Sequence, residues 1–84
     1  MEITVEISYF PLLENHQQPV NDFIGALNKS EKVKVEAGLM SSLLTGSFED
    51  IMKLLHLEMK PFMEKYPSVF TVKVSNSCSV CKTD

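Results

Sequence analysis

The sequence contains no arginine and no tryptophan, and its eight lysines are outnumbered by eleven acidic residues. Arginine is the side chain that most often reads bases and holds phosphates through two parallel hydrogen bonds. Charges of both signs are interspersed, the formal net charge is −3, and no block of one sign occurs. These absences predict a protein that does not bind nucleic acid.

Long hydrophobic runs are also absent, because no window of about eighteen residues is both apolar and uncharged. The start, MEITVEISYF, lacks the basic segment followed by an apolar segment that marks a secretory signal. The two cysteines are too few for the disulfide framework of a small secreted protein. We therefore expect a soluble, cytoplasmic protein without a membrane partner, whose 84 residues form one small domain.

Four segments have the pattern of short strands. ITVEISYF, VKVEAGL and SVFTVKVSN alternate apolar and polar residues with the two-residue period of a half-buried strand. LMSSLLTG is a further extended run. AGLMS, which contains Gly38 and overlaps the start of this run, is typical of a tight hairpin. The second and third strands are therefore predicted to be antiparallel neighbours.

Two segments have the period of amphipathic helices. Pro19 suits a first helical turn, and the apolar residues that follow it predict a helix over about 18 to 28. Ser47 is a good N-cap, and Asp50 three residues later completes an approximate capping box, so a second helix is predicted over about 47 to 64. Its apolar stripe consists of Phe48, Ile51, Met52, Leu55, Met59, Phe62 and Met63.

The resulting β-α-β-β-α-β order predicts an α+β ferredoxin-like sandwich, a four-stranded antiparallel sheet with two helices on one face. We expect this domain to cover residues 1–76, followed by a cysteine-containing tail over residues 77–84. The helix-facing side of the sheet is expected to be filled by apolar side chains, without a cavity. The open side would carry Thr4, Glu6, Ser8, Lys34, Glu36, Thr71 and Lys73.

Residues with metal-binding or catalytic chemistry are few. Met40, Met52, Met59 and Met63 could form a soft-metal site, but three of them continue the helical stripe, which favours core packing. Neither His16 nor His56 has a partner at the spacing of a zinc motif, and no Gly-x-Ser-x-Gly or His-Glu-x-x-His motif occurs. We expect no enzyme activity and no cofactor.

Cys78 and Cys81 form a C-terminal Cys-x-x-Cys pair. Such a pair can share a zinc ion, here with the same pair of a second subunit, or can close a small disulfide. It can equally lie in a tail without a ligand. The alternative function that this pair favours is a metal-binding or thiol-linked regulatory module.

Three functions known for ferredoxin-like domains disagree with the residues. Acylphosphatase chemistry needs an arginine to hold the phosphate, and the sequence has none. Heavy-metal-associated domains carry Cys-x-x-Cys after the first strand, where this chain has PLLENHQQP. RNA recognition modules stack bases on aromatic residues of their central strands, and SSLLTG has none.

The segments ITVEISYFPL, VKVEAGLMSSLLTGSFEDIMKLL and FTVKVS together resemble the YkoF-like family of thiamine- and hydroxymethylpyrimidine-binding proteins. The resemblance spans residues 3 to about 75, and its most telling part runs from Met40-Ser41-Ser42 through Thr45-Gly46 into the second helix. It implies a domain that binds the pyrimidine part of thiamine without catalysis. It also implies self-association, as a homodimer or homotetramer.

Thiamine is a cation with an aminopyrimidine ring, which favours a carboxylate, small hydroxyls and an aromatic or methionine wall. The candidate ligand-binding residues are Ser8, Tyr9, Phe10, Glu36, Met40, Ser41 and Ser42. We expect the ligand on the open side of the sheet, at the end bounded by SYF and GLMSS, near a subunit contact. The alternative is an ordinary solvated surface on which lysines pair with Glu6 and Glu36.

Overall fold

The computed structural model describes residues 1–77, so the predictions for Cys78 and Cys81 lie outside the described residues. The elements in chain order are β1 (Glu2–Pro11), α1 (Gln17–Asn28), β2 (Lys34–Ala37), β3 (Ser42–Ser47), α2 (Phe48–Lys65) and β4 (Ser68–Ser75). Both helices start and end within one residue of the predicted bounds. β3 begins later than LMSSLLTG suggested, because the hairpin loop occupies residues 38–41.

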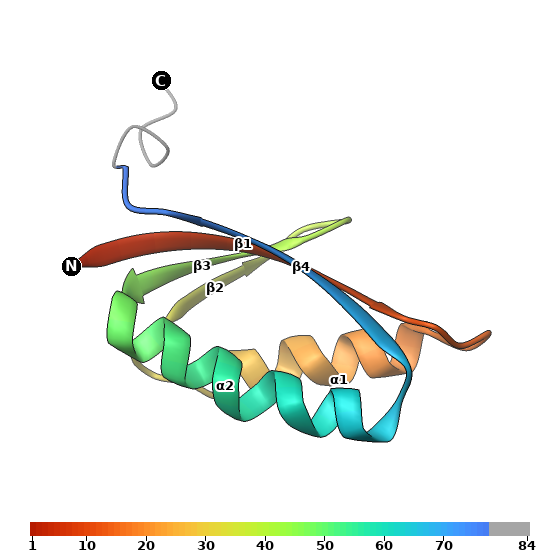
Figure 1. Cartoon of the computed structure of the whole chain (residues 1–84). Helices are drawn as coiled ribbons and strands as arrows, with labels where there is room; N and C mark the ends of the chain where they lie inside the picture. Colours follow the sequence, from red (N-terminus) through yellow and green to blue (C-terminus); the bar gives the residue numbers. More distant parts are fainter. Residues whose placement is uncertain (78–84) are drawn as a thin grey trace.

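The four strands form one antiparallel sheet in the order β2-β3-β1-β4, and both helices lie on the same face of it (Figure 1). This arrangement confirms the predicted α+β ferredoxin-like fold. β1 is central: it pairs with β3 over residues 2–7 and with β4 over residues 4–11. Within residues 1–77, neither helix has the length and apolarity needed to cross a membrane.

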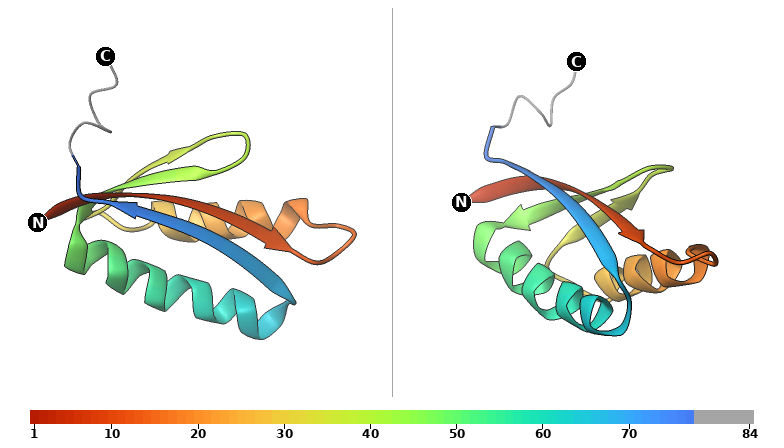
Figure 2. Two further views of the ribbon diagram at one scale, coloured as in Figure 1. Left: turned by 45° about the horizontal axis from the view of Figure 1, so that its top comes forward. Right: turned by 45° about the vertical axis from the view of Figure 1, so that its right-hand side comes forward.

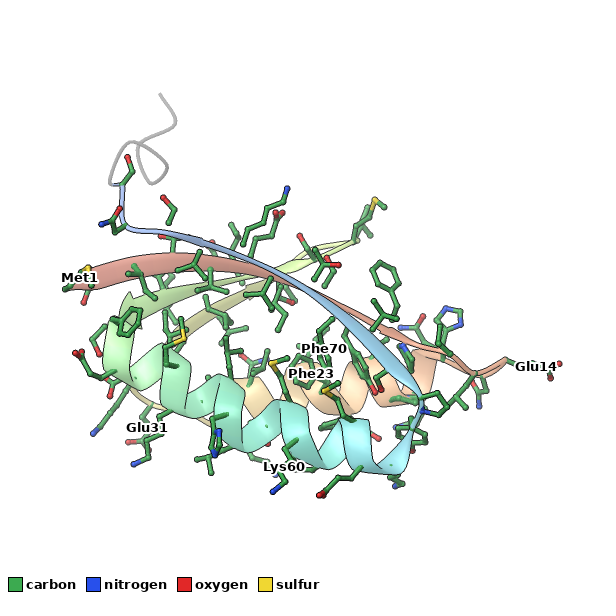
Figure 3. All side chains as sticks on the ribbon, viewed as in Figure 1. Met1, Glu14, Phe23, Glu31, Lys60 and Phe70 are labelled. Carbon is green, nitrogen blue, oxygen red and sulfur yellow. The ribbon has the colours of Figure 1, made fainter. Side chains whose placement is uncertain are left out.

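The core lies between the sheet and the two helices. Alternate residues of β1 are buried against the helices, as the two-residue period predicts. In the core Tyr9 stacks on Phe70 with ring centroids 4.4 Å apart, and Phe23 of α1 lies 5.1 Å from Phe70. Figure 3 shows Phe23 and Phe70 in this layer. The aromatic residues therefore join β1, β4 and α1 near one end of the sheet.

The turn from β3 into α2 needs no linker, because β3 ends at the residue that caps the helix. The Ser47 hydroxyl accepts a hydrogen bond from the Asp50 backbone N–H at 3.1 Å. Glu49 and Asp50 lie in the first turn, where the positive end of the helix dipole stabilises carboxylates. Gly46 packs closely here, since a Cβ on it would lie 3.2 Å from the Lys32 carbonyl oxygen.

Replacing Ser47 by alanine is expected to lower the free energy of unfolding by about 1 kcal/mol, because an N–H at the start of α2 loses its acceptor. Denaturant unfolding of the purified chain measures this change. Ser47→Asp supplies another good cap and should keep most of the stability. Equal losses in both variants would show that the capping bond is not the source.

Candidate functional site

The candidate site arises where the pairing of β1 with β3 stops. The last paired residues are Ile7 of β1 and Ser42 of β3, and beyond them β1 continues with β4 alone to Pro11. The hairpin between β2 and β3 leaves the line of β1 at this point, as the left view of Figure 2 shows. A gap therefore opens between the second half of β1 and the hairpin loop.

The start of α1 closes this gap on the helix side and forms a cavity of about 280 Å³. We call this cavity the helix-side pocket. It is lined by Ile7, Ser8, Tyr9, Phe10, His16, Gln17, Val20, Phe23, Ile24, Gly38, Leu39, Met40, Ser41 and Ser42. None of these side chains is a carboxylate, a lysine or an arginine, so the pocket has aromatic, aliphatic, hydroxyl, amide and imidazole groups but no fixed charge.

Ser42 is the most unusual polar residue of the helix-side pocket. It lies on the same face of β3 as the buried Leu44, and its exposed fraction is only 5%. Among the described residues, its hydroxyl has no hydrogen-bond partner. Within residues 1–77 no fully buried side-chain oxygen or nitrogen lacks a hydrogen-bond partner, so the Ser42 hydroxyl is open to the cavity and can bind a group that enters it.

The hairpin loop is held to β1 by two side chains. The Ser8 hydroxyl donates a hydrogen bond to the Met40 carbonyl oxygen at 3.1 Å, and the Ser41 hydroxyl donates to Glu6 Oε2 at 2.9 Å. Lys73 Nζ lies 3.7 Å from the other oxygen of Glu6. These contacts replace the ladder that ends at Ile7 and fix the wall of the pocket.

A second cavity of about 290 Å³ lies on the opposite face of the sheet, and we call it the open-face pocket. Its lining residues are Glu6, Ser8, Phe10, Met40, Ser41, Thr71 and Lys73. Its carboxylate already binds Ser41 and lies next to Lys73. The open-face pocket therefore has charged groups that mostly satisfy one another.

Six of the seven predicted ligand-binding residues meet at the helix-side pocket, namely Ser8, Tyr9, Phe10, Met40, Ser41 and Ser42. The exception is Glu36, which is exposed on β2 and lines neither pocket at the hairpin.

Two expectations about this end of the sheet need correction. The expectation of no cavity on the helix-facing side is wrong, because the departing hairpin leaves space that the core side chains do not fill. Tyr9 was grouped with an open-side ligand, but its ring is buried on the helix-facing side. Its hydroxyl lies 3.1 Å from the Ser68 hydroxyl.

The contribution of α1 to the pocket was not predicted from the sequence. His16 and Gln17 at its start, and Val20 and Ile24 in its first two turns, line the cavity together with Phe23. Chain connectivity could have indicated this, since a short connection after β1 must begin the next helix near the end of that strand.

The methionines do not gather into a metal site. Met52 and Met59 pack against the core, as predicted, whereas Met63 is exposed and Met40 lies in the hairpin loop. Within residues 1–77, no group of three His, Cys, Asp or Glu side chains is placed to hold a metal ion.

No protein-family model matches the sequence. No curated protein matches it either. Solved structures do match its fold. One is a candidate thiamine biosynthesis/salvage protein from Thermotoga maritima, which is 18% identical to this chain. The TM-score is 0.82, and the match covers 94% of this chain and 87% of that chain.

Two further structures have the same fold. A protein from Streptococcus pneumoniae has 18% identity and a TM-score of 0.84 over 92% of this chain and 88% of its own. A domain of unknown function, DUF77, from Bacillus cereus has 13% identity and a TM-score of 0.67 over 92% of this chain and 77% of that chain. At these identities the likeness shows the fold alone.

The double variant Ser8→Ala, Ser41→Ala is expected to loosen the hairpin loop while the rest of the fold persists. Each lost hydrogen bond contributes about 1 kcal/mol, so exchange of the Gly38 amide, which donates to the Ser41 carbonyl at 2.8 Å, should accelerate by about tenfold or more. Hydrogen exchange followed by NMR measures the rate. Thr71→Ala is the control, and an unchanged Gly38 rate in the double variant would contradict the bridging role.

Proposed function

We propose that the chain binds hydroxymethylpyrimidine, free or as the pyrimidine part of thiamine, in the helix-side pocket and does not catalyse a reaction. The observation that carries this proposal is a mostly apolar cavity with the Ser42 hydroxyl in its wall, a group that makes no hydrogen bond within residues 1–77 and is open to the cavity. The name of the Thermotoga maritima protein supports the same ligand class.

The shape and surface of the pocket suit a small planar ring. Its volume of about 280 Å³ is near the lower end of the range of roughly 300–1,000 Å³ that is common for small-molecule sites. Tyr9 and Phe23 offer aromatic surface, and Met40 offers a thioether that adapts to a ring edge. The faces of a pyrimidine ring can pack against these apolar side chains. Its nitrogen atoms then point to the polar groups of the pocket.

Hydrogen bonding and charge favour entry of the pyrimidine part of the ligand. The Ser42 hydroxyl can donate to a ring nitrogen or accept from the exocyclic amino group, and Gln17 and His16 offer further donors and acceptors. No lining side chain carries a carboxylate, so the cationic thiazolium ring of thiamine gains no counter-charge inside. In our proposal the pyrimidine ring enters and the thiazolium ring stays in solvent.

We also propose that the chain works as a homo-oligomer. The sheet has an uncovered face opposite the helices, and large apolar side chains remain exposed, including Phe10, Val69 and Leu57. A second copy would bury part of this surface.

Replacing Ser42 by alanine is expected to weaken hydroxymethylpyrimidine binding about three- to tenfold, the usual effect of losing one neutral hydrogen bond. Isothermal titration calorimetry with hydroxymethylpyrimidine and with thiamine measures both dissociation constants. Thiamine should lose affinity by a similar factor, because the same ring enters the pocket.

Two matched controls separate the possible locations. Thr71→Ala changes only the open-face pocket, and Glu36→Gln changes a carboxylate that lies off both cavities, so both variants should bind like the parent chain. Weaker binding in Thr71→Ala together with unchanged binding in Ser42→Ala would move the ligand to the open face. No heat of binding with either compound would refute the proposed ligand class.

A further inference from the structure

The helix-side pocket has a buried deep end and an open mouth, and the two differ in chemistry. Tyr9 and Ser42 at the deep end are buried, with exposed fractions of 8% and 5%. His16, Gln17 and Leu39 also line the pocket, but they are exposed and therefore lie at its mouth. A ring that reaches the Ser42 hydroxyl directs its outward substituent past the start of α1.

The start of α1 brings three backbone N–H groups to this mouth. His16, the residue before the helix, has helical backbone angles of φ −83° and ψ −13°, and its carbonyl oxygen accepts a hydrogen bond from the Val20 N–H at 3.3 Å. Within residues 1–77 the N–H groups of His16, Gln17 and Gln18 have no hydrogen-bond partner. Such groups point out of the helix along its axis, so they are available to donate to a ligand.

The side chains around the first turn leave these N–H groups uncovered. Gln17 Nε2 donates to Asn21 Oδ1 at 3.1 Å. Gln18 Nε2 donates to Asp22 Oδ1 at 2.8 Å. Both acceptors lie one turn further along α1, so neither glutamine folds back over the helix start. The first turn contains no acidic residue, and Glu14 in the preceding loop points away from the helix (Figure 3).

A helix start attracts anions because its N–H groups converge there and because the helix dipole is positive at this end. A second observation indicates that this helix start faces a ligand. Ser42 is only 5% exposed, its hydroxyl makes no hydrogen bond within residues 1–77, and it is open to the same cavity. One molecule can therefore use both ends of the pocket, with a polar ring at Ser42 and an anionic group at α1.

We propose that the preferred ligand is the phosphate ester of hydroxymethylpyrimidine, with its ring at Ser42 and its phosphate at the start of α1. This inference rests on the proposed function and deepens it by naming the form of the ligand. The chain has no arginine, and here backbone N–H groups take the place of a guanidinium group. The His16 imidazole can add a further donor, since a neutral imidazole always carries one N–H.

The charge of the substituent decides between related ligands. In the ester the phosphate is attached through the methylene group of the pyrimidine, and in thiamine the same methylene carries the cationic thiazolium ring. Both groups therefore reach the pocket mouth, where the positive helix end favours the phosphate and disfavours the cation. His16 and Gln17 are exposed, so the phosphate keeps part of its hydration there. The expected order of affinity is the ester first, the free alcohol second and thiamine third.

Isothermal titration calorimetry of the full chain with hydroxymethylpyrimidine, its phosphate ester and thiamine tests this order. We expect the ester to bind about five- to tenfold more tightly than the free alcohol, since the helix start and charge-assisted hydrogen bonds act on it together. Equal or weaker binding of the ester would overturn this inference and leave the proposed function standing. If none of the three compounds binds, the proposed function fails as well.

Charge variants of α1 test the position of the phosphate through the ratio of the two dissociation constants, free alcohol to ester. Gln17→Glu places a carboxylate at the helix start and should lower this ratio to about one. Asn28→Asp adds the same charge at the other end of α1, roughly 16 Å along the helix, and should leave the ratio unchanged. Ser42→Ala should weaken both ligands by a similar factor, because both place the same ring at its hydroxyl. An unchanged ratio in Gln17→Glu, or an equal loss in Asn28→Asp, would overturn the phosphate site at α1.

NMR of the parent chain locates the phosphate directly. The ester should shift the amide protons of Gln17 and Gln18 downfield, because these N–H groups then donate to a charged oxygen, and the free alcohol should not. The groove between α1 and α2 is a competing location, since Lys29, Lys32 and Lys53 line it. Shifts at these lysines with Gln17 and Gln18 unmoved would place the phosphate in that groove and overturn the inference.

Discussion

The candidate site depends on a mismatch in strand length. β1 has ten residues and β3 has six, so the ladder between them ends at Ile7 and Ser42 while β1 continues. Backbone groups that leave a ladder need other partners, and here the Ser8 hydroxyl donates to the Met40 carbonyl oxygen. The Ser41 hydroxyl adds a bond between side chains, to Glu6 of β1. The same mismatch separates the hairpin from β1 and leaves the Ser42 hydroxyl facing the resulting space.

The fold was predictable because each element carries its own local signal. The alternation of Ile3, Val5 and Ile7 indicates a strand, and Ser47 with Asp50 indicates the start of a helix, without knowledge of any distant residue. The pocket carries no such local signal. It depends on where two strands stop pairing, which is a property of the register and not of either strand alone.

The carboxylates illustrate the same limit. Glu6 and Glu36 both alternate outward from their strands, and the sequence-based prediction placed Glu36 in the site. The register places both opposite Leu43, one on each side, but only Glu6 meets the hairpin loop through Ser41. Glu36, the carboxylate predicted for the site, thus remains on the surface, and Glu6 supports the loop.

The hairpin loop combines a fixed backbone with free side chains. Its hydrogen bonds involve the Met40 carbonyl, the Ser41 hydroxyl and the Gly38 amide, whereas the Leu39 side chain is fully exposed at the pocket mouth. Substitutions at Leu39 therefore alter the mouth of the pocket at little cost in stability. This separation makes the loop a natural place for ligand preference to diverge during evolution and a practical position for engineering a new specificity onto an unchanged scaffold.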